Sequence, residues 1–216
     1  MVFLDCEFTS LEDPKLLSIA LVAEEGRELY VELSGDSHLK RASTFVIETV
    51  APQFGLVPHA ETSRIDIGKR VGAWLLEFSV PSIDVLYDFH ADMELLESSL
   101  REAAMWTRIK SVLVPTHIGY LIGETVVTTA METSWSASFA ADGIERHHAF
   151  ADARALRAGY FAMHGGGPSV RVHKTSPMKL KPRPALWRSR TTGLPSLRVT
   201  LKQPKLVTQA AKSSQT

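Results

Sequence analysis

The chain has 216 residues, of which 44% are hydrophobic and one is a cysteine. This length suits one ordinary globular domain with a sizeable core and disfavours two large domains. A single cysteine excludes an intramolecular disulfide and a cysteine-rich zinc cluster, so oxygen or imidazole groups would have to bind any metal. We expect a soluble, cytoplasmic protein without a signal peptide or membrane span, because acids interrupt the apolar N-terminus and no run approaches about 18 apolar residues.

The net charge of zero hides two oppositely charged parts of the chain. Residues 1–152 contain 11 Lys and Arg and all 24 Asp and Glu, whereas residues 153–216 contain 13 Lys and Arg and no acid. Such a separation is typical of a solvated surface with a solubilising extension, or of a cation-binding site beside an arm that attracts phosphate. Charge alone favours the first interpretation, so the motifs must decide between them.

The first elements alternate with period two, which is typical of strands. Residues 2–4 form a short apolar run that acids interrupt, and residues 16–22 form a longer one. Residues 29–33 alternate apolar and polar side chains, and Glu25-Gly26 can form the tight turn of a hairpin before them. We therefore expect three strands in a meander.

Apolar residues then recur at spacings of three and four, which predicts helices around residues 42–51 and 62–79. Thr62 or Ser63 can cap the second helix, and Pro81 ends it.

The next part of the chain alternates predicted strands and helices. A buried strand is expected at residues 83–87, a helix at 91–105 and a fifth strand at 111–115. The pattern weakens over residues 116–146 and returns to a helix at 149–163. This order of elements predicts an α/β fold with a mixed five-stranded sheet flanked by helices and a site at the carboxyl ends of the strands.

The C-terminal part has the composition of a chain that cannot form a core. Residues 166–216 contain six of the eleven prolines, 11 Lys and Arg and few large apolar residues. We expect a folded domain over residues 1–164, and a disordered basic tail over 165–216 that begins with a glycine hinge.

Two acidic clusters follow predicted strands. Asp5 and Glu7 lie at the end of the first strand, and residues i and i+2 of an extended chain point to the same side. Asp88 follows the fourth strand, and Asp92 lies in the first turn of the next helix. Each cluster alone is commonly a polar strand end or a helix cap, so neither predicts a site by itself.

The third cluster combines an imidazole with an acid. His147 precedes the last predicted helix, and Asp152 lies five residues further on, in its first turns. A surface histidine beside a salt-bridged aspartate would give the same pattern. The three clusters together are far more specific, because they provide two carboxylates at the first strand, at least one after the fourth strand, and one with an imidazole at the last helix.

These motifs resemble those of the DEDDh 3′-5′ exonucleases, a superfamily with an RNase H-like fold. The Asp-x-Glu motif corresponds to Asp5 and Glu7, the second acid to Asp92, and the His-x4-Asp motif to His147 and Asp152. The resemblance implies that the four acids bind two divalent metal ions, Mg²⁺ or Mn²⁺, and that the histidine is the general base. The surrounding sequences are most similar to small bacterial exoribonucleases of the RNase AS type.

The resemblance covers about residues 1–164 and leaves two assignments to spacing. Asp88 stands where many relatives have asparagine, so we assign the metal to Asp92 and keep Asp88 as a candidate for substrate binding. The x4 spacing selects His147 over His148 as the base.

The expected function is hydrolysis of single-stranded RNA from its 3′ end with release of nucleoside 5′-monophosphates. Carboxylates are the ligands that hard divalent cations prefer, and two such ions serve both ends of a phosphodiester displacement. Phe8 can stack on a terminal base, although an aromatic residue there is more often part of the core. A DNA exonuclease with the same site, a catalytically silent nucleic-acid-binding protein and an unrelated α/β domain remain alternatives. The sequence does not decide between a monomer and a homodimer.

Overall fold

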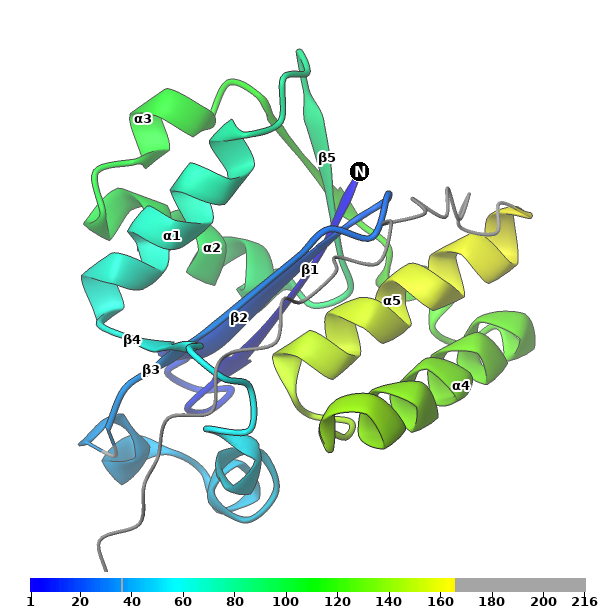
Figure 1. Cartoon of the computed structure of the whole chain (residues 1–216), viewed down its shortest axis with the longest axis horizontal. Helices are drawn as coiled ribbons and strands as arrows, with labels where there is room; N and C mark the ends of the chain where they lie inside the picture. Colours follow the sequence, from blue (N-terminus) through cyan, green and yellow to red (C-terminus); the bar gives the residue numbers. More distant parts are fainter. Residues whose placement is uncertain (36, 166–216) are drawn as a thin grey trace, which may run out of the picture. The chain divides into compact units, whose positions relative to one another are not determined.

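The structure is a computed structural model that describes residues 1–35 and 37–165. These residues form an α/β fold around a mixed sheet with the strand order β4-β3-β2-β1-β5-β6 (Figure 1). The strands are β1 (Val2–Phe8), β2 (Leu16–Ala23), β3 (Glu28–Leu33), β4 (Glu61–Thr62), β5 (Ile83–Tyr87) and β6 (Leu113–His117). The predicted α/β fold and the meander of the first three strands are confirmed.

Six strands replace the expected five. The additional strand, β4, is two residues long and pairs in parallel with the end of β3, where Glu32 lies opposite Glu61. Two residues are too few to show an alternating pattern, so the sequence did not reveal this strand.

The first strand is also longer than predicted, and this extension shapes the site. Asp5 and Glu7 lie within β1, opposite Ala20 and Ser18 of the antiparallel strand β2. On its other side, β1 pairs in parallel with β5 only at Val2 and Phe3. The carboxyl half of β1 therefore has a partner strand on one side only, which leaves the other side open to the segments that follow β5.

Helices cover both faces of the sheet. Figure 1 shows α1 (Arg64–Leu76), α2 (His90–Glu102) and α3 (Trp106–Ile109) on one face, and α4 (Thr125–Asp142) and α5 (Ala149–His164) on the other. Alternate residues of β1 enter the two cores: Leu4 packs in the core beneath α1 and α2, and Phe3 in the core beneath α5. All eight residues of β2 are buried, because helices cover it on both faces.

Two parts of the chain differ in detail from the sequence analysis. The helix expected around 42–51 is present over residues 44–53, but it continues as a π-helical turn, Val46–Val50, and a 3-10 turn, Ala51–Gln53; Pro52 has no backbone N–H to donate to a continuing α-helix. The weak pattern over residues 116–146 contains a 3-10 turn, Gly119–Leu121, and the long helix α4. The remaining predicted helices and strands are present with bounds shifted by a few residues.

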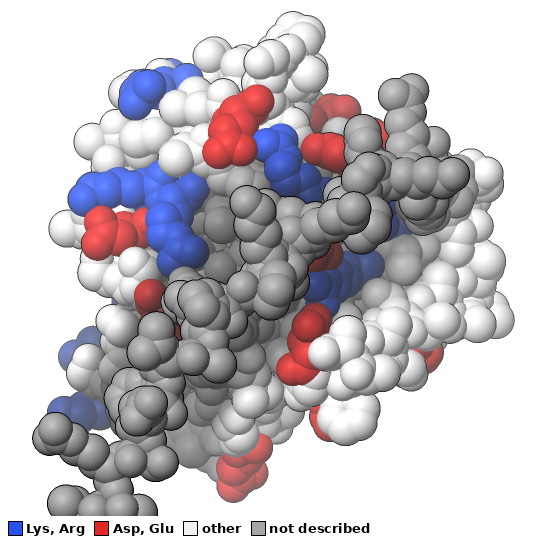
Figure 2. Space-filling view, viewed as in Figure 1, with Lys and Arg blue, Asp and Glu red and all other residues white. Residues whose placement is uncertain are grey.

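Helix α4 escaped sequence analysis because it buries little. Only Val127, Met131 and Ser138 of its 18 residues are buried, which is too narrow an apolar stripe to produce a clear helical period. It contains two charged residues, and in Figure 2 its outer face is mostly uncharged. In the described part of the chain, no helix is long and apolar enough to cross a membrane. The expected basic tail lies, from residue 166 onward, outside the described residues.

Candidate active site and metal centre

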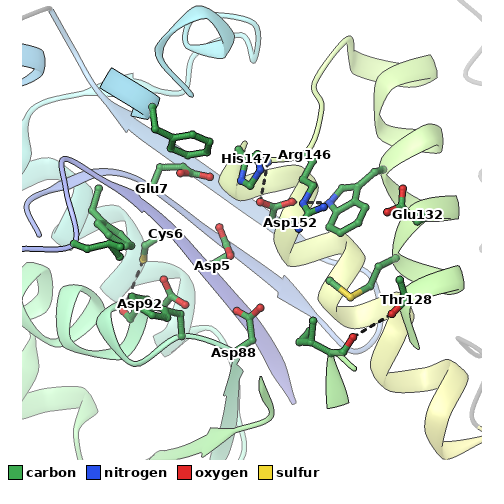
Figure 3. Close-up of a pocket in the computed structure, with 17 residues that line it drawn as sticks. Asp5, Cys6, Glu7, Asp88, Asp92, Thr128, Glu132, Arg146, His147 and Asp152 are labelled. Atoms are coloured by element: carbon green, nitrogen blue, oxygen red, sulfur yellow. Dashed lines mark hydrogen bonds between the residues drawn. The ribbon is translucent and has the colours of Figure 1, made fainter. Parts of the chain in front are cut away.

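Five carboxylates from three separate segments line one pocket beside the open half of β1 (Figure 3). Asp5 and Glu7 come from β1, Asp88 directly follows β5, Asp92 lies in the first turn of α2, and Asp152 lies in the first turn of α5. The structure therefore brings together all four acids predicted to bind metal. It also places Asp88, expected only as a substrate contact, among them.

The pleat of β1 aims two of these carboxylates into the pocket. Cys6, between Asp5 and Glu7, belongs to the core on the other face and is 4% exposed. Its thiol donates to the main-chain oxygen of Asp92, with an Sγ to O distance of 3.7 Å. The strand thus links the first acidic motif to the start of α2.

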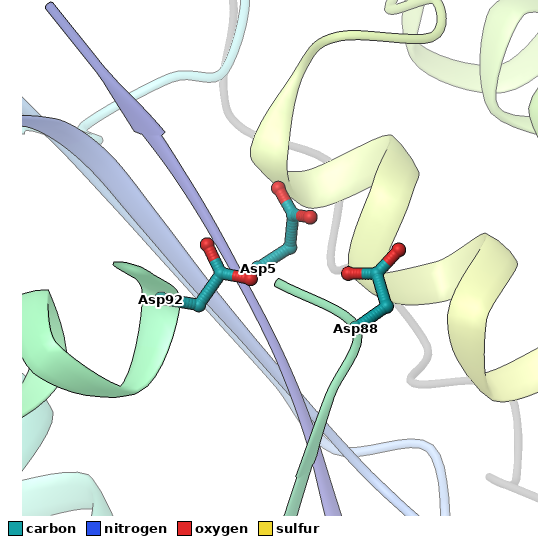
Figure 4. A group of neighbouring side chains, drawn as sticks. All are labelled: Asp5, Asp88 and Asp92. Atoms are coloured by element: carbon teal, nitrogen blue, oxygen red, sulfur yellow. The ribbon is translucent and has the colours of Figure 1, made fainter. Parts of the chain in front are cut away.

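The five acids form two overlapping groups of three. Asp5, Asp88 and Asp92 can each offer an oxygen within 4.8 Å of the other two (Figure 4), and so can Asp5, Glu7 and Asp152. Asp5 belongs to both groups. This arrangement could hold two cations, with the carboxylate of Asp5 between them.

One carboxylate oxygen in this cluster has no protein partner. Asp92 is 2% exposed, and its Oδ2 is buried without a hydrogen bond within the described chain. A buried, unsatisfied carboxylate oxygen is costly to a fold unless a ligand completes it. The donor set is made of carboxylates, which suit Mg²⁺ or Mn²⁺, so these residues fit the divalent metal that the motifs predicted.

Burial and mutual repulsion raise the pKa values of the clustered acids. Desolvation, followed by the charges of Asp92 and Asp152, raises the pKa of Asp5 well above its usual value. Desolvation and the charge of Asp88 raise the pKa of Asp92 to about 8. Desolvation, followed by the charges of Asp152 and Asp92, also raises the pKa of Glu7 well above its usual value. A cation would compensate this negative charge and favour the ionised carboxylates.

Asp152 is oriented at both of its oxygens. The indole Nε1 of Trp135 donates to Oδ1 at 2.5 Å, and the backbone N–H of His147 donates to Oδ2 at 3.0 Å (Figure 3). Desolvation nevertheless raises the pKa of Asp152 to about 7, while these two hydrogen bonds lower it. Trp135 comes from α4, so its contact with Asp152 could not be predicted without that helix.

His147 lies on the pocket, as the x4 spacing predicted. Its backbone has a φ of 66°, and its ring meets the ring of Phe45 edge to face, with centroids 5.0 Å apart. Desolvation and the neighbouring charge of Arg146 lower its pKa. The lowered pKa favours the neutral imidazole, which is the form that can accept a proton.

His148 is turned into the core and has a different task. It is 1% exposed, its Nδ1 accepts a hydrogen bond from Phe150 N at the start of α5, and its ring lies 4.5 Å from that of Tyr30. Desolvation, and then the charge of Arg154, lower its pKa to about 4. His148 is an uncharged helix cap, away from the pocket.

Aromatic side chains line the mouth of the pocket. Phe8 stacks on Phe89 with ring centroids 5.9 Å apart and an interplanar angle of 11°, and Phe89 is 47% exposed. Phe45 is also exposed. Phe8 was singled out from the sequence, whereas Phe89 was missed, although an aromatic residue directly after Asp88 was a usable signal.

Gln53 is a second residue that sequence analysis missed. Its Oε1 accepts from the backbone N–H of Glu145 at 2.7 Å, and its Nε2 donates to the carbonyl oxygens of Arg146 and His147 at 3.2 and 3.4 Å. The side chain thus holds the loop that carries the candidate base. A contact between residues more than 90 positions apart leaves no local signal in the sequence.

No model of a known protein family matches the chain, and a search of curated proteins finds no match. The fold and the geometry of the acidic pocket therefore carry the functional argument.

Proposed function

We propose that this protein is a 3′-5′ exoribonuclease of the DEDDh type, similar to RNase AS. It would hydrolyse single-stranded RNA from the 3′ end by a two-metal mechanism and release nucleoside 5′-monophosphates. The observation that carries the proposal is the pair of three-carboxylate groups that share Asp5 in one pocket.

The architecture supports this proposal. Five longer strands form a mixed sheet in which β2 is antiparallel to both of its neighbours, and helices flank both faces, as an RNase H-like fold would require. The acids lie at the carboxyl end of β1 and just after β5, where α/β sheets commonly place their sites. The single cysteine supports a cytoplasmic location for this activity.

The carboxylates would hold two Mg²⁺ or Mn²⁺ ions. Asp88 and Asp92 would bind at one position, Glu7 and Asp152 at the other, and Asp5 at both. When bound, such ions stabilise the charge that develops on the attacking and leaving oxygens of an in-line displacement.

His147 would act as the general base. An imidazole nitrogen would accept the proton of the attacking water, and the lowered pKa of His147 favours its unprotonated form. The hydrogen bond from His147 N to Asp152 Oδ2 ties the base to a metal-binding carboxylate, so the two groups keep a constant separation.

The stacked pair of Phe8 and Phe89 would bind the bases of the substrate. Aromatic side chains stack on single-stranded nucleic acid without requiring a particular sequence. The preference for RNA over DNA comes from the resemblance to exoribonucleases, so the test below compares both substrates.

The test uses RNA and DNA oligonucleotides labelled at the 5′ end, with Mg²⁺ or Mn²⁺ and with chelator. We expect metal-dependent shortening of RNA from its 3′ end, with nucleoside 5′-monophosphates as products. Asp5→Asn should lower kcat by roughly 10³-fold or more, because a ligand to both ions is lost. The matched control is Asp84→Asn, an exposed acid on β5 outside the pocket, which should keep full activity.

Three results would contradict the proposal. Binding of RNA without hydrolysis would indicate a nucleic-acid-binding protein, and faster hydrolysis of DNA would indicate a DNA exonuclease. Undiminished activity of folded Asp5→Asn, with its fold checked by circular dichroism, would place the reaction outside this pocket.

A further inference from the structure

We infer that Arg146 binds the substrate phosphate immediately upstream of the scissile bond, at the place where the acidic pocket opens into a second groove. This inference rests on the proposed exonuclease function and adds a substrate-binding residue to it. The resemblance to known exonucleases assigned no role to this arginine.

Arg146 is the only Lys or Arg among the described residues that line the acidic pocket. It is exposed, and within the described chain no carboxylate pairs with its guanidinium. Arg154, on the same side of the sheet, instead forms ion pairs with Glu28 and Asp142. A guanidinium that forms no ion pair within the described chain can donate to an anionic ligand.

The guanidinium has a defined position. Its central carbon lies 4.8 Å from the ring centroid of Trp135, the residue that also donates to Asp152. Stacking on an indole leaves the N–H groups at the edge of the guanidinium free to donate. Trp135 thus contacts both the guanidinium of Arg146 and the carboxylate of Asp152, and so places the guanidinium next to the acidic cluster.

A second, adjoining pocket extends past this pair. It shares three lining residues with the acidic pocket, namely Glu132, Trp135 and Arg146, and continues to Phe139 and Glu145. Arg146 therefore lines both pockets, and Figure 3 shows it beside Asp152 and His147 in the acidic pocket. A strand whose 3′ end occupies the acidic pocket can leave through this groove.

Gln53 holds the backbone of this loop in place. Its side chain accepts from Glu145 N and donates to the carbonyl oxygen of Arg146, so the residue before the base has its main chain fixed from a distant segment. A fixed backbone reduces the conformational entropy that the arginine loses when it binds.

The direction of hydrolysis indicates which phosphate of the RNA Arg146 binds. In a 3′-5′ exonuclease the scissile phosphate occupies the acidic cluster, and every other phosphate lies upstream. The carboxylates of the pocket repel the negative charge of the next phosphate upstream. A guanidinium can compensate this repulsion, because its N–H groups are spaced to donate to two oxygens of one phosphate. Arg146 is the described group of the pocket wall that can supply this contact.

The experiment combines a protein variant with a substrate in which one phosphate has lost its charge. Release of the first nucleotide is followed for an RNA oligonucleotide that carries an uncharged methylphosphonate at the linkage next to the scissile bond. A 2′-deoxy sugar precedes this linkage, and the reference oligonucleotide has the same sugar with a normal phosphate. Wild type, Arg146→Gln, Arg146→Lys and the exposed control Arg108→Gln on α3 are compared.

For wild type, we expect the methylphosphonate to lower kcat/KM about tenfold, the effect of one lost charged hydrogen bond. Arg146→Gln should show this loss already on the normal substrate, mainly in KM, and no further loss with the methylphosphonate. Arg146→Lys should fall between the two, and Arg108→Gln should behave as wild type.

Two results overturn the inference: a full methylphosphonate effect in folded Arg146→Gln, or an unchanged KM for the normal substrate in that variant. Failure of the proposed function looks different, because wild type would then release no nucleotide from either oligonucleotide.

Discussion

At the scale of a single residue, Asp92 is a member of the site whose burial lowers the stability of the fold. Its carboxylate is 2% exposed, one of its oxygens has no partner in the described chain, and neighbouring acids repel it. Hydrogen bonds with the backbone of Cys6 and Phe89 lower the pKa of Asp92, but desolvation and the charge of Asp88 outweigh them. A residue placed this unfavourably is better explained by a ligand than by packing.

Replacing Asp92 should therefore separate stability from metal binding. We expect Asp92→Asn to raise the free energy of unfolding of the metal-free protein by about 1–2 kcal/mol, because the amide carries no charge to bury. Addition of Mn²⁺ should raise the Tm of wild type and change that of the variant much less. Thermal unfolding with and without Mn²⁺ measures both effects.

Glu94→Gln, on the exposed side of the same helix, is the matched control and should respond to Mn²⁺ as wild type does. An equal Mn²⁺ response in Asp92→Asn would show that this carboxylate does not bind the ion.

His148 predicts a dependence of stability on pH. Its folded-state pKa of about 4 lies below the value of about 6.5 expected for the unfolded chain, so the unfolded state binds the proton more tightly. The contribution of neutral His148 is thus complete above pH 6.5 and is lost as the pH falls toward 4, by about 3 kcal/mol at most.

Urea unfolding of wild type and His148→Gln at pH 7.5 and 4.5 measures this loss. The contributions of the acidic cluster are common to both proteins, so the difference between them isolates the histidine. We expect the advantage of wild type to shrink at the lower pH. His147→Gln, at a partly exposed position, should show a smaller change, and a pH-independent difference for His148→Gln would contradict the buried, neutral cap.

At the scale of elements, the site depends on how distant segments hold one loop. The 3-10 turn Ala51–Gln53 and the π-helical turn before it lie beside residues 145–147, with Gln53 bonded to their backbone and Phe45 against His147. The loop itself includes a non-glycine residue with a positive φ, His147, a conformation that its surroundings must stabilise. These contacts hold His147, the proposed base, in position before α5.

Removal of the Gln53 side chain should free this loop. We expect Gln53→Ala to lower kcat about tenfold with a stability loss of about 1–2 kcal/mol, because the hydrogen bonds to the loop disappear while the acidic ligands stay. Amide hydrogen exchange at Glu145 should become faster. Glu48→Gln, an exposed change in the same segment, controls for altered charge and should have neither effect; unchanged exchange at Glu145 in Gln53→Ala would contradict this role.

Close packing of α4 on α5 is the second relationship between elements that matters for the site. A Cβ on Gly159 would lie 2.8 Å from Cγ1 of Val127, so the absence of a side chain there lets the helices approach. This approach brings Trp135 to Asp152. Helix α4 thus contributes to the site through the position of the Trp135 indole.

At the scale of the whole molecule, charge is divided between the acidic region and the C-terminal residues. Residues 166–216 contain 11 Lys and Arg and no acid, whereas the first 152 residues carry all 24 acids. Under the proposed function, the carboxylates of the pocket would repel an approaching RNA backbone, whereas bound cations and Arg146 would attract it. A cationic segment can offset this repulsion through release of counterions from the RNA.

Truncation after His164 should therefore weaken binding and leave the chemistry intact. We expect a higher KM for long RNA and a flatter salt dependence, since each phosphate contact contributes a slope of roughly −0.7 in log affinity against log salt for single strands. Turnover at saturating substrate and hydrolysis of very short oligonucleotides should stay nearly unchanged. Equal salt slopes for the full-length and truncated proteins would show that the tail does not bind RNA.

The sequence by itself determined the parts of this protein that depend on local pattern. Apolar runs indicated the five longer strands, and the spacing within each motif placed Asp5 and Glu7 on one side of a strand and selected His147 over His148 for the pocket. The placement of Asp5 and Glu7 follows from the twofold repeat of a strand. The choice of His147 over His148 follows from the His-x4-Asp motif of the family that the sequence resembles. The functional roles of these residues stay predictions.

Only the tertiary structure decided what depends on contacts between distant residues. It placed Asp88 beside Asp5 and Asp92, because pairing of β1 with β5 stops at Phe3 and leaves room for the segment after β5. It also brought Gln53 to the loop before α5, and Trp135 to Asp152 on a helix too weakly amphipathic to predict. Local sequence patterns record the period of each element, whereas these contacts arise only when separate elements pack together.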